Sequence, residues 1–403
     1  MKLLFVHEVN WSEKPIFEIH DYPELLSLRG HQVVFIDFPE YSKPKEFSHF
    51  LDRFTTREQV ASRAHSNSSV EILTPGKICR APFDRLLHSI TVVPLLTRLL
   101  RRRNFDAIVL YGVPTNGWQT VLLSKFFRTP VLFRAIDISH ALRNTSFAPL
   151  IRLAEKFVYR FSDWISANNQ VLAEYCIENG ADSNKVSVDY PGLDLERFQP
   201  SERDSSLQRA RRLEPDDKVV VFMGTLYRFS GIGKFLHLFS EELRKDQRIK
   251  VLILGDGEEK AMIEELVRSL KIAEQVLLTG FVSYGELPNH LKLADVAINP
   301  FENQLVTNGA LPWKVVQYLA CGIPTVSTPL EGLTAFTGKK SDNGIVYSDL
   351  SAVFVAEVAN LLSDPEKRTR MSQQARRFVE LKNNWSNCIV EFETRISNLT
   401  QSK

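Results

Sequence analysis

The sequence has 403 residues, of which 44% are hydrophobic and 24% are charged, and Lys plus Arg exceed Asp plus Glu by two. This composition is typical of a soluble globular protein, and the length predicts two domains because it exceeds what one ordinary core encloses. A net charge near zero argues against a nucleic-acid partner, which a strongly basic surface would attract.

Cysteine usage and the start of the chain predict a cytoplasmic location. No Cys-x-x-Cys pair occurs, which argues against a zinc site or a disulfide framework and fits a reducing compartment. The four cysteines are far apart, at Cys79, Cys176, Cys321 and Cys388. The chain begins directly with a strand-like run at residues 2–6, unlike a signal peptide. No apolar run approaches the roughly 20 residues of a membrane-spanning helix.

The first half of the chain alternates strand-like and helix-like segments, which predicts a parallel sheet covered on both faces. The expected strands are 2–6, 32–38, 70–73, 107–111, 131–136, 164–167 and 186–189. Ligands of such sheets bind beyond the carboxyl ends of the strands. This draws attention to residues 7–11, 112–114 and 134–137, and to the nearby His140.

Residues 77–103 form a basic amphipathic stretch with one acid, Asp84. Its basic residues are Lys77, Arg80, Arg85, Arg98, Arg101, Arg102 and Arg103. We expect Pro94 to kink this stretch or to divide it into two helices. Such a segment favours binding to an anionic membrane surface. The alternative is a core-packing helix with a solvated arginine end, and nucleic acid is disfavoured because the stretch offers no aromatic stacking platform.

The second half begins after a polar, turn-rich linker at 191–218 and repeats the same alternation. The expected strands are 218–223, 251–254, 276–279, 295–300 and 325–327. We expect a second doubly wound domain, followed by a helical tail over 364–402 with a break near 383–386.

One stretch of this half, 309–327, predicts a short helix followed by a strand. Thr307 or Asn308 could cap the helix, Pro312 suits its first turn, and Gly322 suits its end. Lys314 and Gln317 are three residues apart and share a face near the helix start, where an anion is favoured. The pair therefore predicts a phosphate site, although a surface lysine with a polar neighbour is the simpler interpretation.

Several segments of the second half resemble the group 1 nucleotide-sugar glycosyltransferases, which have the two-domain GT-B fold. The matching segments are 191–194 with Phe198 and Pro200, 224–226, 254–257, 280–282 with Leu287, 294–296 with Pro300, and 318–324. Helices at 362–386 also resemble the end of that family. No other phosphate-loop, hydrolase-elbow or zinc motif occurs, and no Asp-x-Asp pair is present to hold a metal diphosphate.

The chain departs from this family at the two glutamates of its Glu-x7-Glu motif, where it has Gly309 and Gln317. The usual basic pair of the first glycine loop is replaced by Thr225 and Ser230. Lys314 with Gln317, together with residues 134–137, is instead similar to the membrane-associated glucuronosyltransferase of xanthan synthesis, which is an inverting enzyme.

The resemblance implies an acceptor-binding domain at 1–200, a nucleotide-sugar-binding domain at 201–380 and a C-terminal helix at 381–403 that crosses back to the first domain. Two Rossmann-like doubly wound domains would face a cleft. The expected donor-binding residues are Lys314, Gln317, Trp313, Arg228, Leu226, Gly224, Phe281, Val282 and Phe301. Asp137 is the expected general base, and His140 is the second candidate for that role.

The implied reaction moves a sugar from a nucleotide-sugar to a lipid-linked or polysaccharide acceptor, with inversion. The donor is expected to be a UDP-sugar, with UDP-glucuronate as the specific candidate, because Gln317 removes a negative charge that would repel a carboxylated sugar. Lys314 would take the place of a metal, so no metal or other cofactor is expected. The protein would be peripheral on the inner face of the plasma membrane.

Two other functions stay open from the sequence. One is a nucleotide-sugar epimerase of the same fold, and the other is a non-catalytic partner of another glycosyltransferase. For Asp137 the structural alternative is the cap of a following helix.

Overall fold

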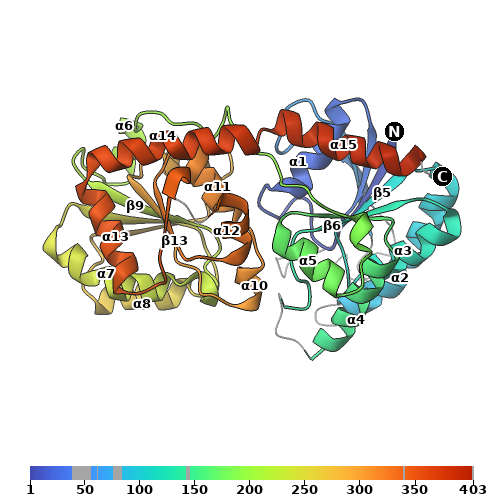
Figure 1. Ribbon diagram of the computed structural model, residues 1–403, viewed down its shortest axis with the longest axis horizontal. Helices are drawn as coiled ribbons and strands as arrows, with labels where there is room; N and C mark the ends of the chain where they lie inside the picture. Colours follow the sequence, from blue (N-terminus) through green and yellow to red (C-terminus); the bar gives the residue numbers. More distant parts are fainter. Residues whose placement is uncertain (39–55, 61, 76–83, 142–145, 339–340, 402–403) are drawn as a thin grey trace. The chain divides into compact units, whose positions relative to one another are not determined.

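The computed structural model describes residues 1–38, 56–60, 62–75, 84–141, 146–338 and 341–401 (Figure 1). The chain divides into two compact units, one of Met1–Pro191 with Ser386–Lys403 and one of Gly192–Trp385. It passes between them at residues 191/192 and 385/386, whereas the sequence predicts boundaries after residues 200 and 380.

The first unit contains one eight-stranded sheet in the order β3-β4-β2-β1-β5-β6-β7-β8. Its strands are β1 (Lys2–Val6), β2 (Gln32–Ile36), β3 (Thr56–Val60), β4 (Val70–Thr74), β5 (Ala107–Leu110), β6 (Val131–Ala135), β7 (Trp164–Ala167) and β8 (Val186–Val188). All neighbours pair in parallel except β3, which runs antiparallel to β4. The sequence prediction missed β3 because its segment, Thr-Arg-Glu-Gln-Val, carries no apolar run.

Helices cover both faces of this sheet (Figure 1). They are α1 (Glu18–Leu28), α2 (Asp84–Arg103), α3 (Gly117–Phe127), α4 (Ala148–Phe161), α5 (Gln170–Glu178) and α15 (Trp385–Gln401). Apolar side chains of α2 to α5 join strand residues in one core. Helices α1 and α15 cover the other face, where the rings of Tyr22 and Phe392 meet at a tilt of 32° with centroids 4.1 Å apart. Helix α2 is continuous through Pro94, so of the two expected outcomes the division into two helices is wrong, and the kink stays a prediction. The start of the basic stretch, residues 77–83, lies outside the described residues.

The second unit is a six-stranded parallel sheet in the order β11-β10-β9-β12-β13-β14. Its strands are β9 (Lys218–Met223), β10 (Ile249–Leu254), β11 (Val276–Gly280), β12 (Val296–Asn299), β13 (Thr325–Ser327) and β14 (Ile345–Tyr347). The central strands β9, β10 and β12 are buried almost throughout, as a parallel sheet requires, whereas most residues of the edge strands β11 and β14 are partly buried.

The helices of the second unit follow the doubly wound pattern. They are α6 (Ser205–Ala210), α7 (Ile232–Lys245), α8 (Lys260–Ser269), α9 (Leu287–Leu291), α10 (Leu305–Asn308), α11 (Trp313–Ala320), α12 (Glu331–Thr337), α13 (Ala352–Ser363) and α14 (Pro365–Lys382). The predicted fold class, two doubly wound α/β units, is thereby confirmed, and the break between α14 and α15 falls at residues 383–384, as predicted.

The helix start expected at 309–312 differs in detail. Thr307 and Asn308 belong to a separate short helix, α10, and Pro312 is the N-cap of α11 without a capping side chain. The two candidate caps are therefore wrong. The helix end is as predicted, because Gly322 adopts a φ of 69° just after α11, a conformation that a glycine tolerates at no steric cost.

None of the helices in the described ranges combines the length and the apolar character that a membrane crossing needs. Within the same ranges, no group of His, Cys, Asp and Glu side chains could hold a metal ion.

Candidate functional site

The strongest site in the second unit centres on Lys314, in the first turn of α11. Its ammonium nitrogen lies 3.9 Å from the ring centroid of Phe301 and 4.3 Å from that of Phe222. Phe301 follows β12 and Phe222 lies near the end of β9, so the carboxyl ends of two neighbouring strands hold the two rings. The lysine therefore lies where ligands of such sheets bind.

Gly224 makes room for this ammonium. It follows β9 with a φ of 138°, and a Cβ at this position would lie 2.8 Å from Nζ of Lys314. A larger residue would be strained and would displace the charge. The loop requires glycine on its other side too, because a Cβ on Gly255 would lie 2.0 Å from the carbonyl oxygen of Gly224.

The charge of Lys314 has no anion to balance it among the described side chains, where no ion pair or hydrogen bond of its ammonium is found. Burial lowers the pKa of Lys314 to about 7. The two ring faces attract the cation but cannot replace the lost hydration in full. A cation held in this way is suited to bind an anionic ligand, and the start of α11 adds its free N–H groups.

Gln317 lies one turn further along α11, and it is 8% exposed. Its side-chain amide makes no hydrogen bond to another described residue, so both its donor and its acceptor are available to a ligand. Trp313, the residue before Lys314, is partly buried. Tyr318 was not predicted to have a role near this site. Its hydroxyl accepts a hydrogen bond of 2.7 Å from the backbone N–H of Met223, and this bond links α11 to β9.

The other residues that the sequence predicts to bind the nucleotide-sugar lie on loops at the same edge of the sheet. Leu226 is fully buried in the apolar core, so only its backbone could meet a ligand, and its N–H already donates to the carbonyl of Asp256. Arg228 is exposed in a short 3-10 turn. Phe281 and Val282 directly follow β11, and Phe281 is 69% exposed. An exposed ring at a strand end is available for stacking on a planar ligand.

In the first unit, Asp137 lies in the loop after β6 and is partly buried. It does not cap the next helix, because α4 begins only at Ala148. Arg134, in the same segment, is fully buried in a bidentate ion pair with Glu18, with both N–O distances at 2.8 Å, and also donates to Ser166 and to the carbonyl of Asp189. Arg134 is therefore a structural residue that anchors the strand before Asp137.

His140 is held by a residue that the sequence did not single out, Glu155 of α4. The fully buried carboxylate accepts from the backbone N–H of His140 at 3.0 Å and contacts its Nδ1 at 2.8 Å. Tyr175 adds a hydroxyl 3.3 Å from each partner, and burial together with the Glu155 charge raises its pKa. A carboxylate on Nδ1 fixes the imidazole and leaves Nε2 as the other polar atom of the ring.

The ends of β1 and β5 hold a second buried acid. Glu8 accepts hydrogen bonds from the backbone N–H groups of Thr115 and Asn116 and from the Thr115 hydroxyl, at the start of α3. Burial raises its pKa. The neighbouring His7 lies against Tyr111 and Phe35, and burial lowers its pKa to about 3. These contacts make both residues parts of the scaffold around α3.

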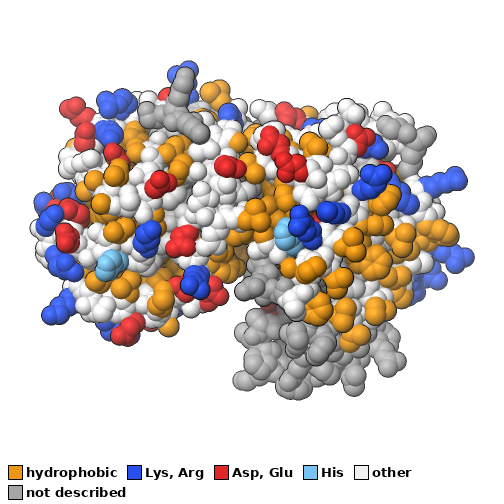
Figure 2. Space-filling model, turned by 60° about the horizontal axis from the view of Figure 1, so that its bottom comes forward, with side chains coloured by type: hydrophobic (Ala, Val, Ile, Leu, Met, Phe, Trp, Pro, Cys, Tyr) orange, Lys and Arg blue, Asp and Glu red, His pale blue; other side chains and the backbone are white. Residues whose placement is uncertain are grey.

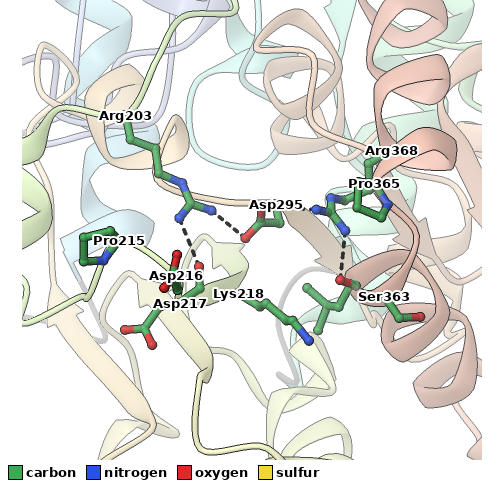
Figure 3. Close-up of a pocket in the computed structure, with 10 residues that line it drawn as sticks. Arg203, Pro215, Asp216, Asp217, Lys218, Asp295, Ser363, Pro365 and Arg368 are labelled. Atoms are coloured by element: carbon green, nitrogen blue, oxygen red, sulfur yellow. Dashed lines mark hydrogen bonds and ion pairs between the residues drawn. The ribbon is translucent and has the colours of Figure 1, made fainter.

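A hollow of about 430 Å³ lies at the opposite, amino end of the second sheet (Figure 3). Its charged side chains neutralise each other: Arg203 lies 2.5 Å from Asp295 and donates to the carbonyl of Asp217, and Arg368 donates to the carbonyls at the end of α13. Figure 3 shows these groups turned toward one another. The two arginines of the hollow are therefore already bound to protein groups.

Comparisons with known proteins find similar sequences and similar folds. Residues 204–378 match the model of the glycosyl transferases group 1, and residues 23–197 match that of glycosyltransferase family 4. Sucrose-phosphate synthase from Thermosynechococcus elongatus aligns over 100% of both chains, with 14% identity and a TM-score of 0.77. The Anabaena protein HepE, solved in complex with UDP, covers 99% of this chain and 100% of its own, with 16% identity and a TM-score of 0.73.

A curated relative, the D-inositol 3-phosphate glycosyltransferase of Segniliparus rotundus, is 25% identical over 269 residues, which cover 64% of this chain and 58% of that protein. The chain thus spans less than two thirds of the length of the curated relatives that it matches. Two doubly wound units of this kind, each matched by a glycosyltransferase model, define the GT-B class. Each unit is therefore similar to one glycosyltransferase family, the second unit to the glycosyl transferases group 1 and the first to glycosyltransferase family 4.

Proposed function

We propose that the protein transfers a sugar from a nucleotide-sugar to a lipid-linked or polysaccharide acceptor. Lys314 carries this proposal, because its partly buried ammonium lacks an anion among the described residues and lies beside the start of α11. A diphosphate would supply that anion, and the lysine would offset the charge that grows on the leaving group. Uridine diphosphate is the nucleotide we propose, supported by the UDP complex of HepE.

The finer proposal is transfer of glucuronate with inversion. Gln317 stands where most group 1 enzymes have a glutamate, so the site lacks a negative charge that would repel a carboxylated sugar. Support comes from the likeness of Lys314, Gln317 and residues 134–137 to the glucuronosyltransferase of xanthan synthesis. The acceptor oxygen would attack C1, the bond from C1 to the phosphate oxygen would break with its electron pair leaving on UDP, and Asp137 would take the acceptor proton. No metal enters this proposal.

The donor site is tested by measuring UDP affinity with isothermal calorimetry. We expect Lys314→Ala to weaken binding by about 100-fold, the scale of losing one positioned charge, and Lys245→Ala, an exposed lysine of α7, to leave it unchanged. Gly224→Ala should weaken UDP binding as well, whereas Gly285→Ala, where a Cβ meets nothing within 4 Å, should not. Unchanged affinity in Lys314→Ala would contradict the proposal.

The transfer step is tested separately with Asp137→Asn. We expect UDP affinity to stay at the parent level and the turnover of UDP-glucuronate with a lipid-linked acceptor to fall at least 100-fold. Turnover near the parent level would exclude Asp137 as the base and direct the same test to His140. A UDP-sugar that changes without any acceptor would point to an epimerase instead.

A further inference from the structure

The outer face of three neighbouring helices in the first unit carries large apolar side chains. They are Leu86 and Ile90 of α2, Trp118, Leu122 and Phe126 of α3, and Leu150, Leu153 and Phe161 of α4, which together we call the outer face. Phe126 is 79% exposed and Leu153 is 65% exposed. Helices α2 and α3 pack against each other, as do α3 and α4, so the set is continuous. Figure 2 shows hydrophobic side chains gathered over this part of the unit.

These residues are a second apolar surface and not an incomplete core. On α3 they recur every four residues at 118, 122 and 126, whereas Val121, which points about 100° away around the helix, is fully buried. On α4, Leu150 and Leu153 point outward while Val158 fills the core. Helices that expose apolar residues on a side already turned away from their own core mark an interaction surface.

Basic residues accompany this surface and acids are almost absent from it. The sequences of α2, α3 and α4 contain nine Lys or Arg but only two acids, Asp84 and the buried Glu155. Arg103 and Lys125 are paired, with Glu71 and Asp163. Six exposed cations form no ion pair with any residue that the structure describes: Arg98, Arg101, Arg102, Arg152, Lys156 and Arg160.

We propose that the outer face is the surface by which the protein docks on an anionic lipid membrane. Apolar side chains would enter the interface between headgroups and acyl chains, and the six unpaired cations would meet anionic headgroups. Charge favours this occupant over a second copy of the chain, because two copies face to face would bring these cations together. The proposal extends the sequence prediction for 77–103 to α3 and α4, and it rests on the proposed function in that it supplies access to a lipid-linked acceptor.

The test is sedimentation of the full-length protein with vesicles of phosphatidylcholine alone or with about one third phosphatidylglycerol. We expect binding only to the anionic vesicles, with a partition coefficient that falls at least 10-fold in Arg98→Glu/Arg101→Glu/Arg102→Glu. The triple variant Leu122→Ser/Phe126→Ser/Leu150→Ser should lower this partition coefficient as strongly. The matched control, Met262→Ser/Val353→Ser/Leu381→Ser, removes three equally exposed apolar residues from the second unit and should leave it unchanged.

Two further measurements separate the possible failures. Analytical ultracentrifugation of the parent protein should show a monomer, and a dimer that the Leu122, Phe126 and Leu150 substitutions dissociate would overturn the proposal in favour of self-association. UDP affinity should be at the parent level in all outer-face variants, and vesicle binding should be at the parent level in Lys314→Ala. Two other results would also overturn the proposal that the outer face docks on an anionic membrane. One is loss of vesicle binding only in the control variant of Met262, Val353 and Leu381, and the other is equal binding to neutral and anionic vesicles.

Discussion

At the scale of single residues, the surroundings of Lys314 are what make this lysine a candidate for binding an anion. The sequence predicts that Lys314 lies at the start of a helix, but this position alone does not establish that the lysine binds an anion. The structure adds two phenylalanine rings around the ammonium and a glycine that leaves space for it. Phe222 could not be predicted as part of this site, because it lies within a strand whose other residues fill the core.

The lowered pKa of Lys314 predicts a specific pH dependence. In the free protein this group loses its proton near pH 7, and a bound diphosphate would restore its charge. Lys314 should therefore add no pH dependence to UDP affinity below pH 7. As pH rises from 7 to 9, UDP affinity should fall by up to tenfold per pH unit. Below pH 7 the lysine is already charged, so binding then requires no proton.

Calorimetry at pH 8 in two buffers of different ionisation enthalpy measures this proton. We expect uptake of about 0.9 proton per UDP in the parent protein, and Lys314→Arg should take up none because arginine stays charged. An affinity that does not change between pH 7 and 9 in the parent would show that Lys314 is charged before the ligand binds.

At the scale of elements, one buried glutamate connects helix α4 to the loop after β6. Glu155 holds the backbone and ring of His140, three residues beyond Asp137. The same helix presents its outward residues on the outer face, so its two sides have different roles. A lone glutamate within Ala-Glu-Lys gives no sign in the sequence that it points inward, which is why the residue was missed.

We expect Glu155→Ala to destabilise the first unit by about 1–3 kcal/mol, because the partly buried N–H of His140 would lose its acceptor. Transfer should fall because the loop that carries Asp137 loses its anchor, while UDP affinity should not change. Thermal unfolding, turnover and calorimetry measure the three effects, and Glu178→Ala, an exposed acid on α5, is the control. A loss of UDP affinity in Glu155→Ala would mean that the loop acts on the donor.

The elements themselves were largely predictable, and the reasons are physical. Runs such as Val219–Phe222 can only be buried strands, and glycine at Gly224 and Gly322 marks the turns that need a positive φ. The continuity of α2 was not predictable, because a proline in a helix can be accommodated or can end it. The side-chain contacts of Lys314 and His140 depend on residues distant in sequence, and a single chain without structure does not reveal them.

At the scale of the whole molecule, residues 386–403 complete the first unit. From helix α15, Phe392 packs against the ring of Tyr22, Glu393 pairs with Arg29 and His31, and Arg395 pairs with Asp189. Phe392 is 1% exposed, so it is part of the core on this face of the sheet. The first unit is thus built from both ends of the described chain.

We expect Phe392→Ala to cost about 3–5 kcal/mol of stability, confined to the first unit, because it empties the space beside Tyr22. Calorimetric unfolding should show a lower transition for that unit, and UDP binding by the second unit should be retained below it. Val390→Ala, 42% exposed on the same helix, should change stability by less than about 0.5 kcal/mol. Loss of UDP binding in step with the first transition would show that the units unfold as one.

The discontinuous first unit also sets an order of events during synthesis. Residues 192–385 form a continuous unit, so they can reach their fold as soon as they have left the ribosome. The first unit, although translated earlier, keeps Tyr22 and its neighbours uncovered until residue 392 and those around it arrive. The unit that carries the outer face is therefore completed last, and a nascent chain would gain the unit proposed to bind the donor before the unit proposed to bind the membrane.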